Sequence, residues 1–317
     1  MRDGIVWSVI LVTAVAATAC GQREQPPAPQ PTPVVALQPA PAPAVPPATP
    51  PPVAEAPPPP PPVKGAMPFG FPSVQTTTAK VGDYVLCPPR EWIDKALADP
   101  SETLIYYTST MLEPGELESK VRSLVGDEMS IPNGMLIPIP SGERAEPGDI
   151  VLTWWQSGSG MQRSIVVPGG TPEAPSVLHL DIDYDNPSGA GKNVDTLRAN
   201  SFHKLAAEWE LGTAVACKGD GGYKHGIITA LQGDKVLAHG FAGGMKVYDK
   251  ATCVPLPVRP QLKTGDTVWF ESFGGFSEGV VKNVDSKIGR AFVEFDFAGE
   301  KRQEAVPFGN ISATPLP

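Results

Sequence analysis

A short motif that recurs four times places the strongest constraint on how this chain folds. Each copy has a glycine, followed by aspartate in three copies, and then the alternation of residues that is typical of a β-strand. The copies read KVGDYVLC, EPGDIVLT, ELGTAVAC and KTGDTVWF, with their glycines at Gly82, Gly148, Gly212 and Gly265. These glycines are 66, 64 and 53 residues apart. Self-similarity at such intervals indicates repeated supersecondary units.

The residues after each glycine predict a core. The third and fifth of them share one face of the strand, which we expect to be buried. These positions are Val85, Cys87, Val151, Thr153, Val215, Cys217, Val268 and Phe270. The last repeat has strand-like runs at Thr267–Ser272, Glu278–Val284, Arg290–Phe297 and Gln303–Pro307. In the first repeat an insertion predicts a short helix at Glu91–Ala98 and a strand at Leu104–Leu112.

The last repeat resembles the Tudor branch of the SH3-like barrels. The resemblance rests on GDTVWF, SEGVVKNV, FVEFDFAGE and AVPFGNI, which follow the family's order of strands and turns. It covers Lys263–Ile311 well, the third repeat moderately and the first two only in outline. The resemblance implies a bent, five-stranded antiparallel barrel. We therefore expect an all-β chain with four tandem small SH3-like or Tudor-like barrels.

The same resemblance implies candidate ligand-binding residues. Tudor domains often bind methylated lysine or arginine in an aromatic cage through cation–π attraction. In the last repeat, three of the four cage positions hold Phe273, Phe276 and Phe295, and the fourth holds Ala298, which is not aromatic. In the third repeat, the first cage position holds Asp220, and two others hold Tyr223 and His239. We therefore carry Phe273, Phe276, Phe295 and Tyr223 forward as weak ligand-binding candidates, with loop and core packing as the alternative.

The first residues predict export. A charged start precedes the apolar run GIVWSVILVTAVAATA, which is shorter than the roughly 20 residues of a membrane-spanning helix. The segment Ala17–Cys20 resembles the lipobox of bacterial lipoproteins, which implies a signal peptide at 1–19 and lipidation of Cys20. Gly21, rather than aspartate, follows the cysteine and favours the outer membrane. An ordinary signal peptide with an incidental cysteine and an uncleaved anchor are the alternatives.

Proline dominates the next segment. Residues 26–62 hold about half of the chain's 39 prolines. Proline lacks the backbone donor that helices and sheets need, so we expect a semi-rigid linker at 20–72, with a reach on the order of 100 Å. A docking segment for proline-binding grooves is the alternative. The repeats then occupy 73–143, 144–208, 209–259 and 260–317, the first with its insertion.

Charge and composition restrict the partners. The net charge of −9 and the pI near 5.0 argue against a nucleic-acid partner, which would require a basic face. We expect the membrane to be reached through the N-terminal lipid. The remaining partner would be an envelope protein, a peptide or a wall polymer, and no cofactor is expected.

No strong catalytic or metal motif is present. The four histidines, His179, His203, His225 and His239, have no metal-ligand spacing. Asp181, Asp183 and Asp185 break the calcium-loop pattern early, so we expect a solvated strand there. Trp154 and Trp155 predict either packing between barrels or the rim of a binding site.

The cysteines after Cys20 are Cys87, Cys217 and Cys253. Cys217 and Cys253 bracket one repeat, on its first and last strands, so they are the disulfide candidate. A Cys87–Cys253 bridge, or three free buried thiols, are the alternatives. The sequence as a whole favours a lipid-anchored, non-catalytic binding or scaffold module of the cell envelope. An envelope hydrolase with a site between barrels and a purely structural surface protein are the other hypotheses.

Overall fold

The recurring glycine motif forms the same tight turn before the first strand of four sheets. The glycines at 82, 148, 212 and 265 have φ values of 90°, 93°, 93° and 95°, which glycine adopts without steric cost. In three copies the following aspartate accepts a hydrogen bond from the backbone N–H three residues earlier, as from Lys80 to Asp83 Oδ2 at 2.9 Å. In the third copy Thr213 replaces the aspartate and accepts from Glu210 N at 3.4 Å. The motif therefore has a local structural cause.

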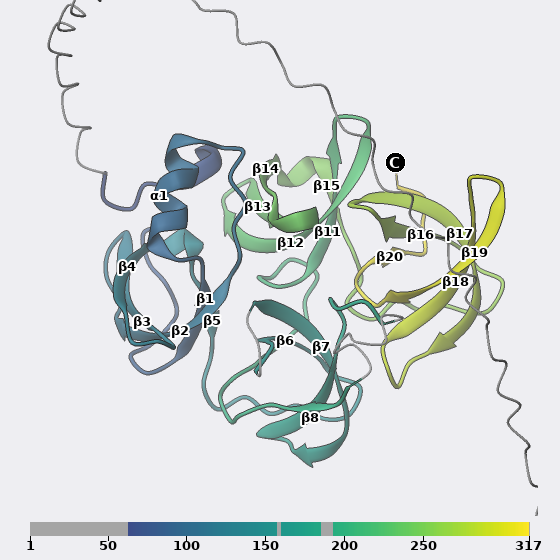
Figure 1. Cartoon of the computed structure of the whole chain (residues 1–317), viewed down its shortest axis with the longest axis horizontal. Helices are drawn as coiled ribbons and strands as arrows, with labels where there is room; N and C mark the ends of the chain where they lie inside the picture. The colour runs from purple at the N-terminus through teal and green to yellow at the C-terminus, as the bar shows by residue number, and fades with distance from the viewer. Residues whose placement is uncertain (1–62, 157–159, 185–192, 317) are drawn as a thin grey trace, which may run out of the picture. The chain divides into compact units, whose positions relative to one another are not determined.

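The computed structural model describes residues 63–156, 160–184 and 193–316, which belong to one compact unit. Four five-stranded antiparallel sheets follow one another along the chain (Figure 1). The first contains β1 (Tyr84–Cys87), β2 (Tyr107–Glu113), β3 (Glu118–Ser123), β4 (Glu128–Pro132) and β5 (Ile137–Ile139). The second contains β6 (Ile150–Trp154), β7 (Met161–Thr171), β8 (Ala174–His179), β9 (Asp195–Thr196) and β10 (His203–Lys204).

The other two sheets repeat this plan. The third contains β11 (Ala214–Gly219), β12 (Gly222–Gln232), β13 (Lys235–His239), β14 (Met245–Asp249) and β15 (Cys253–Pro255). The fourth contains β16 (Thr267–Ser272), β17 (Gly275–Asp285), β18 (Arg290–Phe297), β19 (Glu300–Pro307) and β20 (Ile311–Ser312). In every sheet four strands form a meander, and the last short strand pairs with the first.

These sheets are arranged as a four-bladed β-propeller, so the prediction of four tandem SH3-like or Tudor-like barrels was wrong. The all-β class and the four repeats are as expected. The reason for the difference lies in the second face of the strands. All five residues of β6 are buried, with Val151 packed within its own sheet while Ile150 and Leu152 enter a cluster that residues of all four sheets share. An isolated antiparallel barrel would leave one of these faces in water.

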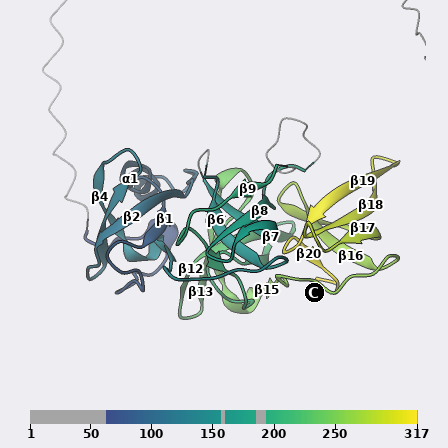
Figure 2. The same ribbon diagram turned by 90° about the horizontal axis from the view of Figure 1, so that it is seen from below.

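Contacts between sheets close a ring in the order first, second, fourth, third. The first and second meet where Met161 N donates to Tyr106 O at 2.9 Å, and the second and fourth where Arg163 Nη2 donates to Asn310 Oδ1 at 2.6 Å. The fourth and third meet through His225 N and Gly274 O at 3.1 Å, and the third returns to the first through Gly243 O and Leu104 N at 3.0 Å. Figure 2 shows the second and third sheets between the first and fourth.

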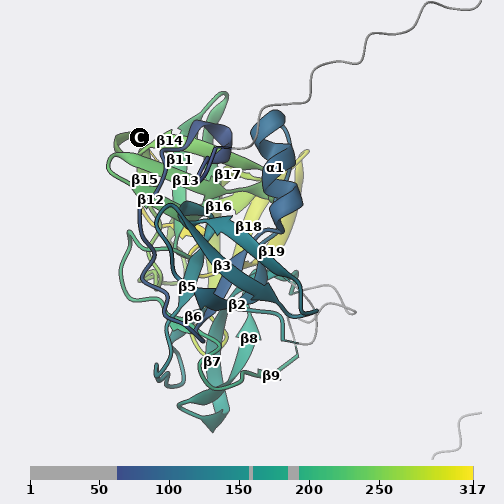
Figure 3. The same cartoon turned by 90° about the vertical axis from the view of Figure 1, so that its left-hand side faces the viewer.

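The first repeat carries the helix of its insertion. Helix α1 (Arg90–Ala98) confirms the short helix expected at Glu91–Ala98, and it contacts β4 and the 3₁₀ turn η1 (Pro68–Gly70) (Figure 3). A second 3₁₀ turn, η2 (Asn133–Met135), precedes β5. Met67 and Phe71, which flank η1, are buried in the shared cluster. Within the described residues, no helix has both the length and the apolar character needed to cross a membrane.

The local predictions for strands and core hold. β16 and β18 have the expected bounds, while β17 and β19 begin three residues earlier than expected. All eight positions at the third and fifth place after the glycines are buried. The expected strand at Leu104–Leu112 is observed as β2, which begins at Tyr107.

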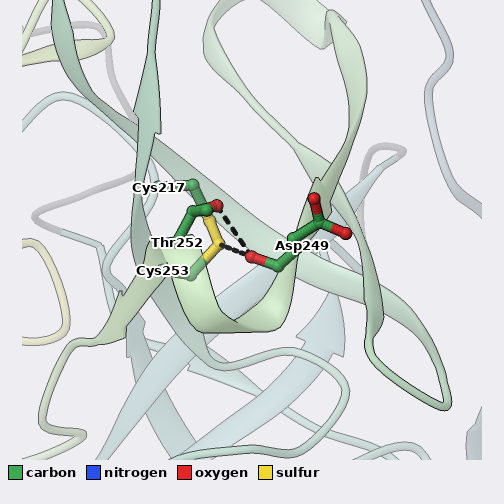
Figure 4. The surroundings of a disulfide bond; sticks show 4 residues. All are labelled: Cys217, Asp249, Thr252 and Cys253. Atoms are coloured by element: carbon green, nitrogen blue, oxygen red, sulfur yellow. Dashed lines mark hydrogen bonds between the residues drawn. A yellow bond between two sulfur atoms is a disulfide. The ribbon is translucent and has the colours of Figure 1, made fainter.

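A disulfide joins Cys217 on β11 to Cys253 on β15 (Figure 4). The two residues are direct partners in the antiparallel register of these strands. The 3₁₀ turn η5 (Lys250–Thr252) leads into Cys253, and Thr252 Oγ1 donates to Asp249 O at 2.7 Å. Cys87 is a free, buried thiol, and burial raises its pKa to about 12, against the opposing hydrogen bond with Ser109.

His203 makes the stability of the fold depend on pH. Its Nδ1 lies 2.7 Å from Glu143 Oε1 and its Nε2 lies 3.4 Å from Glu210 Oε2. Burial favours the neutral ring, but the hydrogen bonds and charges of the two carboxylates outweigh it and raise the pKa of His203. The protonated ring therefore contributes stability that is fully present below the ordinary pKa of about 6.5 and is lost as pH rises through the higher folded pKa.

We expect the melting temperature to fall as pH rises above about 6.5, and His203→Gln to flatten this dependence. Differential scanning calorimetry across this range measures the effect, and Glu143→Gln should flatten it too. The other three histidines have lowered pKa values, so their contributions are lost only as pH falls below about 6.5. A melting curve with an equal slope in wild type and His203→Gln would contradict the prediction.

Candidate functional site

The strongest candidate site is a polar cavity of about 430 Å³ where the second, third and fourth sheets meet, which we call the recess. Its lining is formed by Met161, Gln162, Leu180, Asp181, Ile182, Asp183, Tyr184, His225, Ile227, His239, Gly240, Phe241, Glu271, Gly274, Arg290, Glu304, Ala305, Pro307 and Asn310. Its size falls in the range of small-molecule sites, and its chemically active residues come from three repeats that are distant in sequence.

An ion pair forms one wall of the recess. Arg163 on β7 is 3% exposed, and its Nε donates to Asp181 Oδ1 at 3.1 Å. The backbone N–H of Arg163 donates to Asp181 Oδ2 at 2.7 Å, because the ladder between β7 and β8 continues through Leu180. Burial opposes ionisation of Asp181, but the charge and hydrogen bonds of Arg163 outweigh it and lower the pKa of Asp181. The side chain is still 25% exposed, so the carboxylate is deep but accessible.

Glu271 supplies a second carboxylate with different partners. Its Oε1 accepts from Gly274 N at 2.8 Å and its Oε2 accepts from Asn310 Nδ2 at 3.5 Å. Asn310 in turn accepts from Arg163, so one amide connects both carboxylates of the recess. Within the part of the chain that the structure describes, Glu271 forms no ion pair. Its negative charge is therefore compensated by neutral donors only.

Two neutral histidines line the recess from the third sheet. Burial and, after it, the charge of Arg163 lower the pKa of His225 to about 3, against the opposing effects of Asp181 and of the hydrogen bond with Asn310. Its Nε2 is buried and makes no hydrogen bond at normal distance. Burial also lowers the pKa of His239, whose Nε2 donates to Leu104 O at 2.9 Å. Neither ring is charged at neutral pH.

Arg290 shapes the recess from the fourth sheet. Its Nη2 donates to the backbone carbonyls of Leu180 at 3.1 Å and Ile182 at 3.1 Å, and its Nη1 donates to Ala305 O at 2.9 Å. The guanidinium also lies 4.9 Å from the ring centroid of Tyr184. Arg290 therefore holds the segment after β8 in place beside the recess.

One exposed phenylalanine, Phe241, lines the recess, and another, Phe273, directly precedes the lining residue Gly274 in the chain. Phe241 is 63% exposed and Phe273 is 78% exposed. Phe273 has a φ of 50°, which is rare for a bulky side chain and often occurs at functional sites. Phe241 packs closely on the next residue, Gly274, where an added Cβ would lie 2.6 Å from the Phe241 Cβ. Aromatic surface is thus available next to the carboxylates.

The predicted aromatic cage does not assemble. Phe295 packs on Phe270 within the fourth sheet, with ring centroids 5.0 Å apart. Phe276 and Tyr223 pack against a separate apolar cluster of the third sheet, and Phe273 is exposed. Loop and core packing is thus the observed role of Phe276 and Phe295.

The two neighbouring tryptophans have different environments. Trp154 is 2% exposed and packs on Tyr84 of the first sheet at a centroid distance of 5.0 Å. It therefore packs between neighbouring sheets, while Trp155 is half-buried and its N–H donates to Gly160 O at 3.1 Å. The strand expected at Asp181 is not observed, because β8 ends at His179, but Asp181 and Asp183 are exposed to solvent as expected, and Asp181 also pairs with Arg163. Asp185 and Cys20 lie outside the described residues.

A Ser–His–Asp arrangement lies within the second sheet. Ser164 Oγ is 2.8 Å from His179 Nδ1, and His179 Nε2 is 3.5 Å from Asp195 Oδ2. The order of the three groups is that of a nucleophile, a base and an orienting carboxylate. However, the Ser164 and His179 side chains are fully buried, because the register of β7, β8 and β9 places them inside the sheet. A substrate cannot reach the serine, so this arrangement is structural.

A second cavity, of about 570 Å³, lies beside the first sheet. The buried Cys87 and Trp154 line it together with Leu124 and Val125, which are 60% and 85% exposed. Its lining also includes polar and charged residues, at Arg90, Glu91, Tyr107, Thr108, Ser109, Ser123 and Asp127. Among the described residues, no three His, Cys, Asp or Glu side chains are grouped so that they could hold a metal ion.

Sequence reasoning missed the residues that matter most in the recess. Arg163, Glu271 and Asn310 stand in no recognisable motif, and they meet only because the second and fourth sheets pack together. Comparison with models of known protein families and with curated protein sequences finds no match for this chain. The geometry of the recess therefore carries the functional argument.

Proposed function

We propose that this protein is a non-catalytic binding module of the bacterial cell envelope and that the recess is its ligand-binding site. The observation that carries the proposal is the convergence of carboxylates, neutral histidines and exposed aromatic side chains from three sheets on one cavity. A scaffold without a ligand has no need for buried polar groups, which cost stability unless they are paired. The partner would be an envelope protein, a peptide or a wall polymer, and not a nucleic acid.

The proposal includes a lipid anchor at Cys20 and a proline-rich linker that carries the propeller away from the membrane. The lipobox-like segment supports the anchor, and Gly21 supports the outer membrane rather than the inner one. The Cys217–Cys253 disulfide supports an exported location, because such bonds persist in oxidising compartments. Mass spectrometry of the N-terminal peptide tests the anchor, and an unmodified Cys20 thiol would exclude it.

The hydrolase alternative finds no support in the recess. A hydrolase between sheets would need a nucleophile beside a base in an accessible cleft. Among the residues that the structure describes, the lining of the recess contains no serine, threonine or cysteine, and the Ser164–His179 pair is buried elsewhere. The arrangement of the recess therefore favours binding over turnover.

Filling the recess should abolish binding while the fold persists. Gln162 lies on β7 in the recess wall, so Gln162→Trp replaces part of the cavity with an indole. The test measures the melting temperature of the full chain with a panel of amines, amino acids, monosaccharides and short peptides, because a ligand of the native state raises it. We expect at least one class of compound to raise the melting temperature of wild type and not that of Gln162→Trp.

The matched control is Gln303→Trp, on the exposed strand β19 and outside the recess lining. It should respond to the compounds as wild type does. The proposal fails if no compound stabilises wild type, or if the stabilising compounds act equally on Gln162→Trp.

A further inference from the structure

The polarity of the recess indicates which ligand it accepts. Among the described residues, four carboxylates line it, at Asp181, Asp183, Glu271 and Glu304, and Arg290 is the lining cation. Asp181 pairs with Arg163 behind the wall, whereas Glu271 has neutral partners only. An anionic ligand would be repelled by this potential, and a cationic one would be attracted.

Glu271 is the carboxylate best placed to meet a cation. Its partners are the neutral backbone of Gly274 and the neutral amide of Asn310, whereas Asp181 already pairs with Arg163. These two hydrogen bonds also restrict the carboxylate to one orientation, so little side-chain freedom is lost when a ligand binds. Glu271 is therefore both uncompensated and pre-oriented.

The recess also holds a buried acceptor that has no donor. Gln162 Oε1 is buried and makes no hydrogen bond in the described structure. A buried acceptor without a donor costs about 1–3 kcal/mol, and a ligand with several N–H groups would recover this cost.

A primary ammonium group matches these features. It carries one positive charge and three N–H donors and accepts no hydrogen bond. The exposed ring of Phe241 in the lining provides apolar surface for the aliphatic chain that bears the ammonium. The geometry points to a specific ligand class: the recess binds a primary alkylammonium group, as in the side chain of lysine or another diamino acid. This inference rests on the proposed binding function.

The experiment titrates the full chain with Nα-acetyl-lysine amide and follows binding by isothermal titration calorimetry. Nα-acetyl-norleucine amide, which lacks the ammonium, should bind at least about 10-fold more weakly, since hydrogen bonds to a charged group carry most of the affinity. The Nε-trimethyl form keeps the charge but has no N–H donor at that nitrogen, so it should also bind at least about 10-fold more weakly. Cadaverine tests the source of the group: binding as tight as that of the lysine amide indicates a free amine, and weaker binding indicates a peptide.

Two variants locate the binding. Glu271→Gln should weaken lysine amide binding about 10- to 100-fold, and Gln162→Met, which removes the neutral side-chain amide with its Oε1 acceptor, should weaken it less. The matched control is Glu300→Gln, on β19 and outside the recess lining, which should bind as wild type does. Circular dichroism melts of each variant confirm that the fold is retained.

The ligand class is wrong if norleucine amide or the trimethyl form binds as tightly as lysine amide. It is also wrong if Glu271→Gln and Glu300→Gln behave alike. Nα-acetyl-glutamate amide and N-acetylglucosamine separate this failure from that of the proposed function. If either binds wild type but not Gln162→Trp, the recess is a binding site for another class of ligand; if no probe binds, both proposals fail.

Discussion

Replacing Arg163 by methionine should lower the free energy of unfolding by about 3 kcal/mol, because the change breaks an ion pair whose cation is buried. Arg163 also donates to Asn310, so the variant weakens the join between the second and fourth sheets. Chemical denaturation monitored by tryptophan fluorescence measures the loss. The expected size lies at the low end for a buried pair because Asp181 is still 25% exposed.

The matched control is Arg122→Met. Arg122 pairs with Glu128 on the first sheet, where both side chains are about half exposed. An exposed pair contributes at most about 1 kcal/mol, so this variant should unfold almost as wild type does. The double variant Arg163→Met/Asp181→Leu should recover part of the loss, because it removes the unpaired charge. Equal losses for Arg163→Met and Arg122→Met would show that the recess pair has no special role.

Removing the disulfide should lower the free energy of unfolding by a similar amount. The bond joins residues separated by 36 positions, and closing a loop of this length in the unfolded chain contributes about 3–4 kcal/mol. The variant Cys217→Ser/Cys253→Ser should therefore melt well below wild type in calorimetry. Wild type treated with a reducing agent should melt at the temperature of the double variant. A loss of less than about 1 kcal/mol would mean that the pairing of β11 with β15 is sufficient without the bond.

The sequence predicted the features that depend on neighbouring residues. The Gly-Asp turn requires a left-handed glycine and a short side-chain acceptor, and both requirements are met within four residues. The buried positions after each glycine follow from alternation along a single strand, and all eight are buried. The disulfide candidate came from the positions of Cys217 and Cys253 within one repeat, and these cysteines are joined in the structure.

The architecture could not be predicted in the same way. Strand order and turn chemistry are compatible with separate barrels and with the blades of a propeller, and the resemblance of the last repeat to Tudor barrels favoured the wrong choice. The deciding feature is what covers the outer face of strands such as β6, where Ile150 and Leu152 meet residues of other sheets. Alternation along β6 identifies its two faces but does not say which neighbour covers the second one.

The candidate site shows the same limit. Asp181 and His225 are residue types that can bind metals or act in catalysis, but their sequence positions predicted a solvated strand and an ordinary strand histidine. Arg163, Glu271 and Asn310 gave no local signal, because the hydrogen bonds that join them to one another and to Asp181 span between 18 and 147 residues.

The sequence by itself determined four repeats, their turns, their buried strand faces and the cysteine pair, since each of these depends on residues within one repeat. Only the tertiary structure decided that the repeats form a propeller and that their polar residues create a recess. The physical reason is that packing between sheets depends on the shapes and charges of whole faces. Those faces are assembled from residues that no spacing rule connects.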